Sequence, residues 1–151
     1  MAPPRFSPPK EKIDIIKYLT SKGSPFAEYR DILFFAAMIG WHKSRRIPLQ
    51  LKGEAIRWDV MTNRHGTEYI TDMIAVADAP DDPSILATAR QDERVQLLEE
   101  YAHGGLQVLE EMMSAAGAIS LETLFINAIQ EALAGNGNEG PLDLADEILN
   151  L

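Results

Sequence analysis

Apolar residues recur at helical spacing along most of the chain, and glycines mark the predicted helix ends. The first periodic run covers residues 8–22 and stops at Gly23, a residue suited to the left-handed conformation that ends many helices. The second run, 26–39, follows a Ser-Pro start signal, is apolar on nearly every side and meets Gly40. Because a helix that is apolar all round has to be buried, we predict that residues 26–39 lie at the centre of the core, in a helix that ends at Gly40.

The second half of the chain predicts further helices. Residues 67–77, a short segment after Asp82-Pro83 and residues 121–133 all show helical apolar spacing. The longest run spaces its small and apolar residues alternately by three and four, a seam that predicts close packing against another helix: Val95, Leu98, Ala102, Gly105, Leu109, Met112 and Ala116. Gly104-Gly105 in its middle costs about 1 kcal/mol per glycine relative to alanine. Either a neighbouring backbone comes close there or the helix breaks in two.

These patterns predict a mainly α fold, a compact bundle of about five to six helices with one long basic loop and a short C-terminal amphipathic helix. We divide the chain into a flexible proline-rich arm at 1–8, a single helical domain at 9–134, a flexible linker at 135–140 and an acidic amphipathic tail at 141–151. The tail is too short to form a stable helix alone, so we expect it to dock through its apolar residues: Leu142, Leu144, Ile148 and Leu149. Its own globule, a second copy and another subunit are all open as docking sites.

Charge divides the chain into two opposite parts. The net charge is −9, but residues 1–66 hold 12 Lys and Arg against 6 Asp and Glu, whereas residues 67–151 hold 2 against 17. This asymmetry indicates an anionic partner for the first part or attraction between the two parts, within or between subunits. The alternative is that both are ordinary solvated faces.

Basic residues concentrate in the loop predicted over 41–58, in which a short hairpin is an option. Its candidate contacts with a partner or a nucleic acid are Lys43, Arg45, Arg46, Lys52 and Trp58. A pI near 4.7 weighs against DNA binding unless the acidic part faces away. An acidic protein surface would suit the same loop equally well.

Candidate chemistry is sparse. The chain has no Cys, which excludes disulfides, thiolate zinc sites and a cysteine nucleophile, and it contains no phosphate-binding glycine motif. Many carboxylates stand as adjacent pairs, a pattern typical of a solvated helix face. We therefore predict no enzyme activity, no catalytic or metal-binding residue and no cofactor, with a metal-dependent nuclease as a less favoured alternative. Without a signal segment or an apolar run of about 20 residues, we expect a soluble cytoplasmic protein.

Two stretches carry a family resemblance. They are residues 29–40 (YRDILFFAAMIG) with the following 44–49 (SRRIPL), and residues 99–106 (EEYAHGGL). Together they resemble the DNA phosphorothioation-associated protein 4 family, small proteins encoded beside the Dnd-type DNA sulphur-modification and restriction systems of bacteria and archaea. The resemblance spans about Arg5 to Met113.

The resemblance implies an accessory role in phosphorothioate-linked antiviral defence, next to larger ATPase and nuclease subunits. We expect a non-enzymatic accessory or regulatory subunit that contacts other subunits of the system through the basic loop and the acidic tail. A DNA-binding transcriptional or targeting regulator of the same system is the alternative. The seam and the opposite charges also favour a homo-oligomer.

Overall fold

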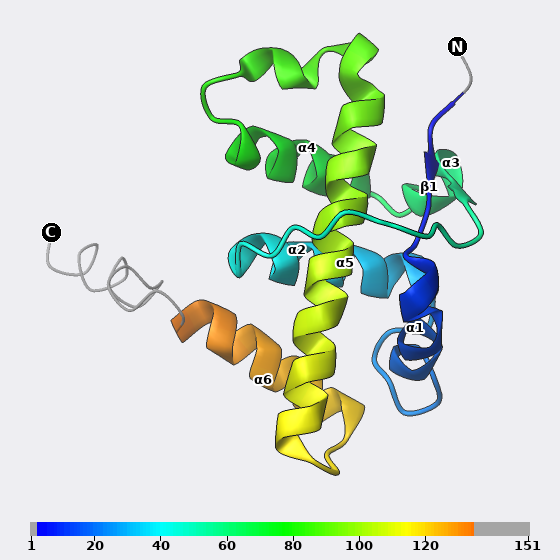
Figure 1. Ribbon diagram of the computed structural model, residues 1–151, viewed down its shortest axis with the longest axis vertical. Helices are drawn as coiled ribbons and strands as arrows, with labels where there is room; N and C mark the ends of the chain where they lie inside the picture. The colour runs from blue at the N-terminus through cyan, green and yellow to red at the C-terminus, as the bar shows by residue number, and fades with distance from the viewer. Residues whose placement is uncertain (1–2, 135–151) are drawn as a thin grey trace, which may run out of the picture.

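A long helix forms the axis of the molecule, and the other elements pack around it (Figure 1). The computed structural model describes residues 3–134. In chain order the elements are β1 (Arg5–Phe6), the 3-10 helix η1 (Lys10–Lys12), α1 (Ile13–Leu19), α2 (Tyr29–His42), β2 (Ile56–Arg57), α3 (Trp58–Met61), α4 (Thr67–Asp78), the 3-10 helices η2 (Pro83–Leu86) and η3 (Thr88–Arg90), α5 (Gln91–Ala116) and α6 (Leu121–Ala134). The predicted mainly α class is confirmed.

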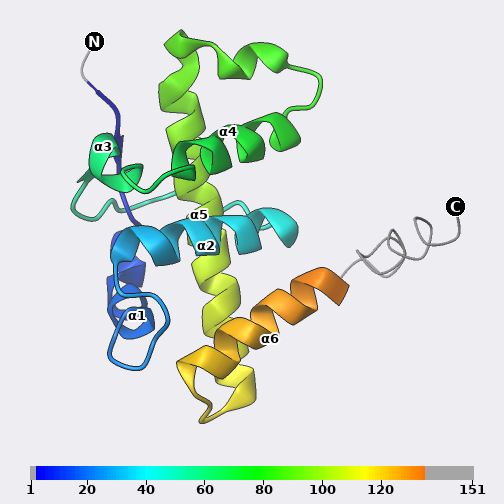
Figure 2. The same ribbon diagram turned by 180° about the vertical axis from the view of Figure 1, so that it is seen from behind.

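Helix α2 crosses α5 near its middle and makes the most extensive helix–helix contact in the described chain (Figures 1 and 2). Its residues from Ile32 to Ala37 are all buried, which confirms that this helix lies at the centre of the core. On α5, the predicted seam is buried at its first five positions and becomes partly exposed at Met112 and exposed at Ala116. The seam therefore packs chiefly against α2.

Glycines permit this crossing. A Cβ atom on Gly105 would overlap the carbonyl oxygen of Ala36, and one on Gly40 would overlap the carbonyl oxygen of Tyr101. A Cβ on Gly104 would overlap the carbonyl oxygen of Arg45 in the loop that follows α2. Helix α5 is unbroken, so close approach of a neighbouring backbone explains the Gly104-Gly105 pair.

The prediction that the second helix ends at Gly40 is wrong. Helix α2 continues to His42, because Gly40 has a helical backbone and faces α5 instead of stopping the helix. The first predicted helix is shorter than expected, with α1 ending at Leu19, but Gly23 does adopt the predicted left-handed conformation at φ +96°. Periodicity identified the helices, whereas the role of each glycine depended on its neighbours.

The proline-rich N-terminal segment is not a flexible arm in its described part. Arg5 and Phe6 pair antiparallel with Arg57 and Ile56, and Phe6 is fully buried. The backbone N–H of Ser7 donates a 2.5 Å hydrogen bond to Oε2 of Glu99 on α5. One aromatic side chain and one buried carboxylate therefore hold the segment against α5. The strand that it pairs with, β2, also replaces the short hairpin considered for the basic loop.

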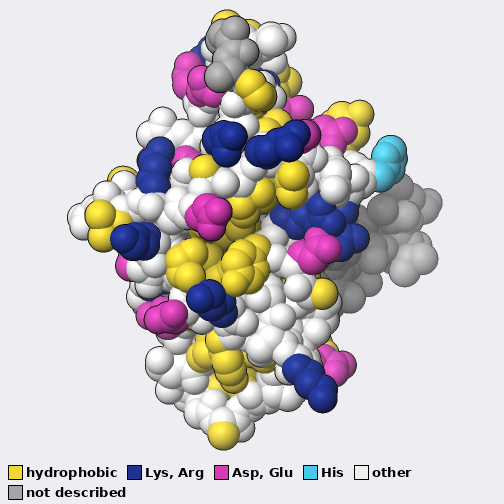
Figure 3. Space-filling view, turned by 90° about the vertical axis from the view of Figure 1, so that its right-hand side faces the viewer, with side chains coloured by type: hydrophobic (Ala, Val, Ile, Leu, Met, Phe, Trp, Pro, Cys, Tyr) yellow, Lys and Arg dark blue, Asp and Glu magenta, His cyan; other side chains and the backbone are white. Residues whose placement is uncertain are grey.

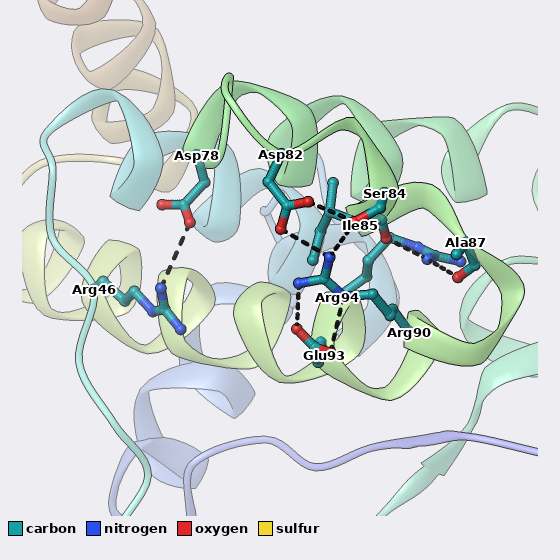
Figure 4. Close-up of polar contacts among 9 residues, drawn as sticks. All are labelled: Arg46, Asp78, Asp82, Ser84, Ile85, Ala87, Arg90, Glu93 and Arg94. Atoms are coloured by element: carbon teal, nitrogen blue, oxygen red, sulfur yellow. Dashed lines mark hydrogen bonds and ion pairs between the residues drawn. The ribbon is translucent and has the colours of Figure 1, made fainter.

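The connection from α4 to α5 is held by arginines (Figure 4). The buried guanidinium of Arg94 donates to the carbonyl oxygens of Ile85 and Ala87, at 2.6 and 2.8 Å. Arg90 pairs with Asp82 and Glu93, each at 2.8 Å. Hydrogen bonds from Ser84 and Arg90 hold the pKa of the Asp82 carboxyl below its usual value. The two arginines of the acidic part thus stabilise an irregular turn, because they satisfy carbonyls and carboxylates that no helix would pair.

The predicted linker 135–140 and tail 141–151 lie outside the described residues. Within residues 3–134, no single helix is long and apolar enough to cross a membrane; the segments Thr88–Ala116 and Leu121–Ala134 meet that test only as a pair, which is bent by 113°.

Candidate binding groove between α2, α4 and α6

Helices α2, α4 and α6 pack on the same side of α5, with the C-terminal half of α2 between the other two (Figure 2). A surface groove of about 480 Å³ lies among them. Its lining comes from all three helices: Phe35, Met38, Ile39, Trp41 and His42 from α2; Ile70, Met73, Ile74 and Ala77 from α4; Ile129, Ala132 and Leu133 from α6. We call this feature the α2/α4/α6 groove.

The groove exposes large apolar side chains to water. Met73 is 69% exposed, Leu133 57% and Met38 42%. Exposed apolar residues are common singly, but a contiguous set in a concave surface is typical of a binding site. Figure 3 shows the side of the molecule that carries α1 and β1, where apolar and charged side chains are interspersed. The almost wholly apolar lining makes the α2/α4/α6 groove the strongest candidate site.

A polar pocket continues the groove at one end. It is lined by Ser44, Asp78 and Tyr101 together with three groove residues, Trp41, His42 and Ala77, and has a volume of about 340 Å³. The Tyr101 hydroxyl donates a hydrogen bond to Asp78, whose carboxylate also lies 3.6 Å from Nη1 of Arg46. Burial and then the hydrogen bond to Asp78 raise the pKa of the Tyr101 phenol to about 12. This pocket offers a few oriented polar groups beside a large apolar surface.

The candidate contact residues of the basic loop are mostly engaged within the chain. Lys43 lies 2.5 Å from a carboxylate oxygen of Glu131, and Arg45 lies 2.8 Å from one of Glu111. Arg46 lies 2.6 Å from Oε1 of Glu100, a carboxylate whose side chain is only 10% exposed. These pairs join the basic part of the chain, residues 1–66, to the acidic part, residues 67–151. The opposite charges therefore attract each other within one chain, which was one of the alternatives.

The other two candidate residues lie elsewhere. Lys52 is exposed in the loop, and its charge lowers the pKa of Glu99 against the larger raising effect of burial. Trp58 begins α3 and is partly buried against the core. The structure therefore does not bring the five predicted residues together in one patch. The candidate tail residues, Leu142, Leu144, Ile148 and Leu149, lie outside the described residues.

A second polar cluster lies along α5 beneath the N-terminal segment. Burial raises the pKa of Glu99, while the hydrogen bond from Ser7 opposes that shift. One turn further along α5, His103 is buried, with Nε2 3.3 Å from Glu11 and Nδ1 3.2 Å from the Ile47 carbonyl oxygen. Among residues 3–134, no three His, Asp or Glu side chains gather closely enough to hold a metal ion. We interpret the cluster as the polar surface of α5 on which the N-terminal segment packs.

Sequence reasoning missed the groove. Met38 and Met73 look like core positions in their helices, and Ile129 falls on the apolar stripe of the last helix. The signal available in the sequence was an excess of apolar residues on α4 and α6. In α4 the buried residues are Thr71, Ile74 and Ala75, and further apolar side chains are exposed: Tyr69, Met73 and Val76. A helix with more apolar residues than its core face can bury often has a second contact surface.

The fold and the groove define a small, mainly α protein with an apolar surface groove that ends in a polar pocket. Within that class, the chain belongs to the DNA sulphur modification system-associated protein 4 family, whose family model matches residues 5–146. The match confirms the family resemblance and extends past Met113 and α6 into the segment predicted as the tail. No curated protein and no solved structure matches the chain. As the family's name states, its members are associated with a DNA sulphur modification system.

Proposed function

We propose that this chain is a non-enzymatic accessory subunit of a DNA sulphur modification system and binds another protein of that system through the α2/α4/α6 groove. The observation that carries the proposal is the exposed, almost wholly apolar lining of the groove. Burying such a surface against a partner contributes a favourable hydrophobic term of roughly 25 cal/mol per Å² of apolar area removed from water, which offsets the entropy lost on association. Such a surface can bind a partner without any catalytic group. This suits an accessory role in phosphorothioate-linked defence.

The shape and charge of the groove favour an amphipathic helix as the ligand. The two walls are helices, and a third helix laid along them would make contacts typical of helix-in-groove recognition. Neither α4 nor α6 contains a Lys or Arg residue. Of their five carboxylates, Asp72, Asp78 and Glu131 lie in ion pairs with Arg94, Arg46 and Lys43, whereas no cation among the described residues pairs with Glu68 or Glu122. We therefore propose a partner helix whose apolar stripe is flanked by Lys or Arg.

A DNA-binding regulator is the less favoured function. Phosphate affinity depends on the number of cations that a protein presents to the backbone. Lys43, Arg45 and Arg46 already pair with carboxylates of α4, α5 and α6, and those helices surround the loop with negative charge. DNA would have to displace these carboxylates before it reached the cations.

The test is co-purification with the proteins encoded in the same sulphur modification system. Met73→Glu places a carboxylate in the groove, and Val76→Glu is the matched control, because Val76 is exposed on the same helix but does not line the groove. We expect Met73→Glu to reduce partner recovery at least tenfold, about 1.4 kcal/mol or more of binding free energy, while Val76→Glu retains it. Both variants should keep the wild-type circular dichroism spectrum. Full recovery of the system's proteins by folded Met73→Glu would refute the groove as the contact surface.

A further inference from the structure

We propose that residues 141–151 of this same chain dock into the α2/α4/α6 groove and cover it until another protein displaces them. The regulatory meaning of this inference rests on the proposed function, whereas the docking itself does not. Three properties of the chain support it: the pattern of the tail, the point where the described structure ends and the size of the groove. The distribution of charge opposes tight docking and makes the contact displaceable.

The tail sequence separates its polar and apolar residues onto opposite sides of a helix. At about 100° per residue, a helix over 141–151 would place its acidic and amide side chains within about 100° of arc and its apolar side chains on the opposite half. The polar set is Asp143, Asp146, Glu147 and Asn150, and the apolar set is Leu142, Leu144, Ala145, Ile148, Leu149 and Leu151. An apolar face that covers half of a helix is wide enough to contact a floor and two walls. This is the geometry that a groove between helices offers.

The described structure ends at the groove. Ala132 and Leu133 line it, and the described part of the chain extends one residue further, to Ala134. The predicted linker 135–140 (GNGNEG) is rich in glycine, and a glycine-rich random coil of six residues spans on average about 13 Å and at most about 20 Å. The tail therefore begins within reach of the groove at an effective concentration in about the millimolar range. The groove is therefore mostly occupied if the intrinsic dissociation constant of the tail lies below this effective concentration.

The sizes agree as well. An 11-residue helix is about 16 Å long, and α4, which forms one wall, is about 18 Å long at its 12 residues. The apolar side chains that docking would cover are Met38, Trp41, Met73 and Leu133, each at least 41% exposed in the described structure. The family match also reaches residue 146 and so includes the first half of the tail.

Charge makes this contact displaceable. The segment 139–147 carries four acidic residues and no basic ones, and the helices that form the groove walls also lack Lys and Arg. Repulsion between these charges weakens the docked state, which tethering offsets. A partner helix with basic flanks meets attraction instead, so it replaces the tail once its local concentration is high enough. The tail thus acts as a cover that suppresses non-specific apolar contacts.

Cross-linking in the full chain tests the docking directly, because the chain has no native Cys. We would combine Ile148→Cys with Met73→Cys in the groove, or with Tyr18→Cys, a control position that is 48% exposed on α1. We expect the groove pair to form an intramolecular disulfide at least about tenfold faster than the control pair, at a rate independent of protein concentration. Adding Leu142→Asp and Leu149→Asp should remove the difference in rate between the groove pair and the control pair. Raising the salt concentration should not reduce that difference, because salt screens the like-charge repulsion between the tail and the groove walls.

Two outcomes would overturn the proposal. Equal rates for the groove and control pairs would show that the tail does not favour the groove. Disulfide-linked dimers that form in place of the intramolecular product, faster at higher protein concentration, would assign the groove to a second copy. The experiment contains no other protein, so its result is independent of the co-purification test. Failure of that test with successful cross-linking would remove the partner helix and leave the docked tail in place.

Discussion

Gly105 of α5 lies directly against the backbone of Ala36 in α2, so closely that a Cβ atom on Gly105 would overlap the Ala36 carbonyl oxygen. Helix propensity alone would make Gly105→Ala stabilising by up to about 1 kcal/mol. Because the obstacle is a backbone atom on a buried helix, the two helices would have to separate, and we expect a net loss of about 3 kcal/mol or more of unfolding free energy. Urea denaturation measures it. Ser114→Ala, at an exposed position of the same helix, is the control and should change stability by less than about 0.5 kcal/mol. A stable Gly105→Ala protein would contradict the close crossing.

The ion pairs of the basic loop should differ in strength according to burial. Lys43→Ala breaks a pair whose side chains are 32% and 51% exposed, so we expect a cost below about 1 kcal/mol. Arg46→Ala leaves the nearly buried Glu100 without its guanidinium and also removes the cation near Asp78, so we expect about 2 kcal/mol. Urea denaturation of the two variants side by side gives the comparison. Equal costs would show that Arg46 contributes no more than an exposed surface charge.

Glu99 should make stability fall as pH rises. Burial raises the pKa of this carboxyl above its usual 4.5, so between the unfolded and folded pKa values the folded state binds more protons than the unfolded state. Its contribution to stability is therefore fully present below about pH 4.5 and declines as pH rises through the folded pKa. Glu99→Gln keeps an acceptor for the Ser7 N–H and removes the ionisation. We expect this variant to match the wild type near pH 4 and to gain stability relative to it towards pH 8, as measured by urea denaturation across that range. A variant that loses stability relative to the wild type as pH rises would contradict the assigned shift.

The Tyr101 phenol should titrate late. Its pKa of about 12, compared with 10.0 for a free phenol, results from burial and from the hydrogen bond to Asp78. Ultraviolet difference titration of the tyrosines should show one late transition, which Tyr101→Phe removes. Asp78→Asn should lower this pKa only part of the way towards 10, because burial, the larger cause, remains. A late transition that persists in Tyr101→Phe would assign the effect to another tyrosine.

Several elements of the fold followed from local pattern. The buried central helix α2, the α5 seam and the left-handed turn at Gly23 were all predicted correctly, because apolar periodicity records which face of a helix avoids water. The prediction of a flexible arm at 1–8 is wrong for the described residues of that segment. Its prolines correctly excluded a helix, but nothing local to Phe6 indicates the distant strand β2 with which it pairs.

The candidate site depended on relationships that no local pattern contains. Whether Lys43 is free or paired is decided by Glu131, 88 residues away, and Met73 becomes a groove residue through the placement of α2 and α6 beside α4. A sequence can show that a residue is apolar or charged, but the partner of a charge and the cover of an apolar side chain are set by long-range packing.

By itself, the sequence determined the approximate positions of the longer helices, the opposite charges of the two parts and the family, because each depends on residue order over short distances or on overall composition. Only the tertiary structure decided that the glycine pair marks a helix crossing, that much of the basic loop's charge is balanced within the chain, and that an apolar groove opens between α2, α4 and α6. Each of these is a contact between segments far apart in the chain, and the energy of such a contact depends on distances that only the folded chain defines.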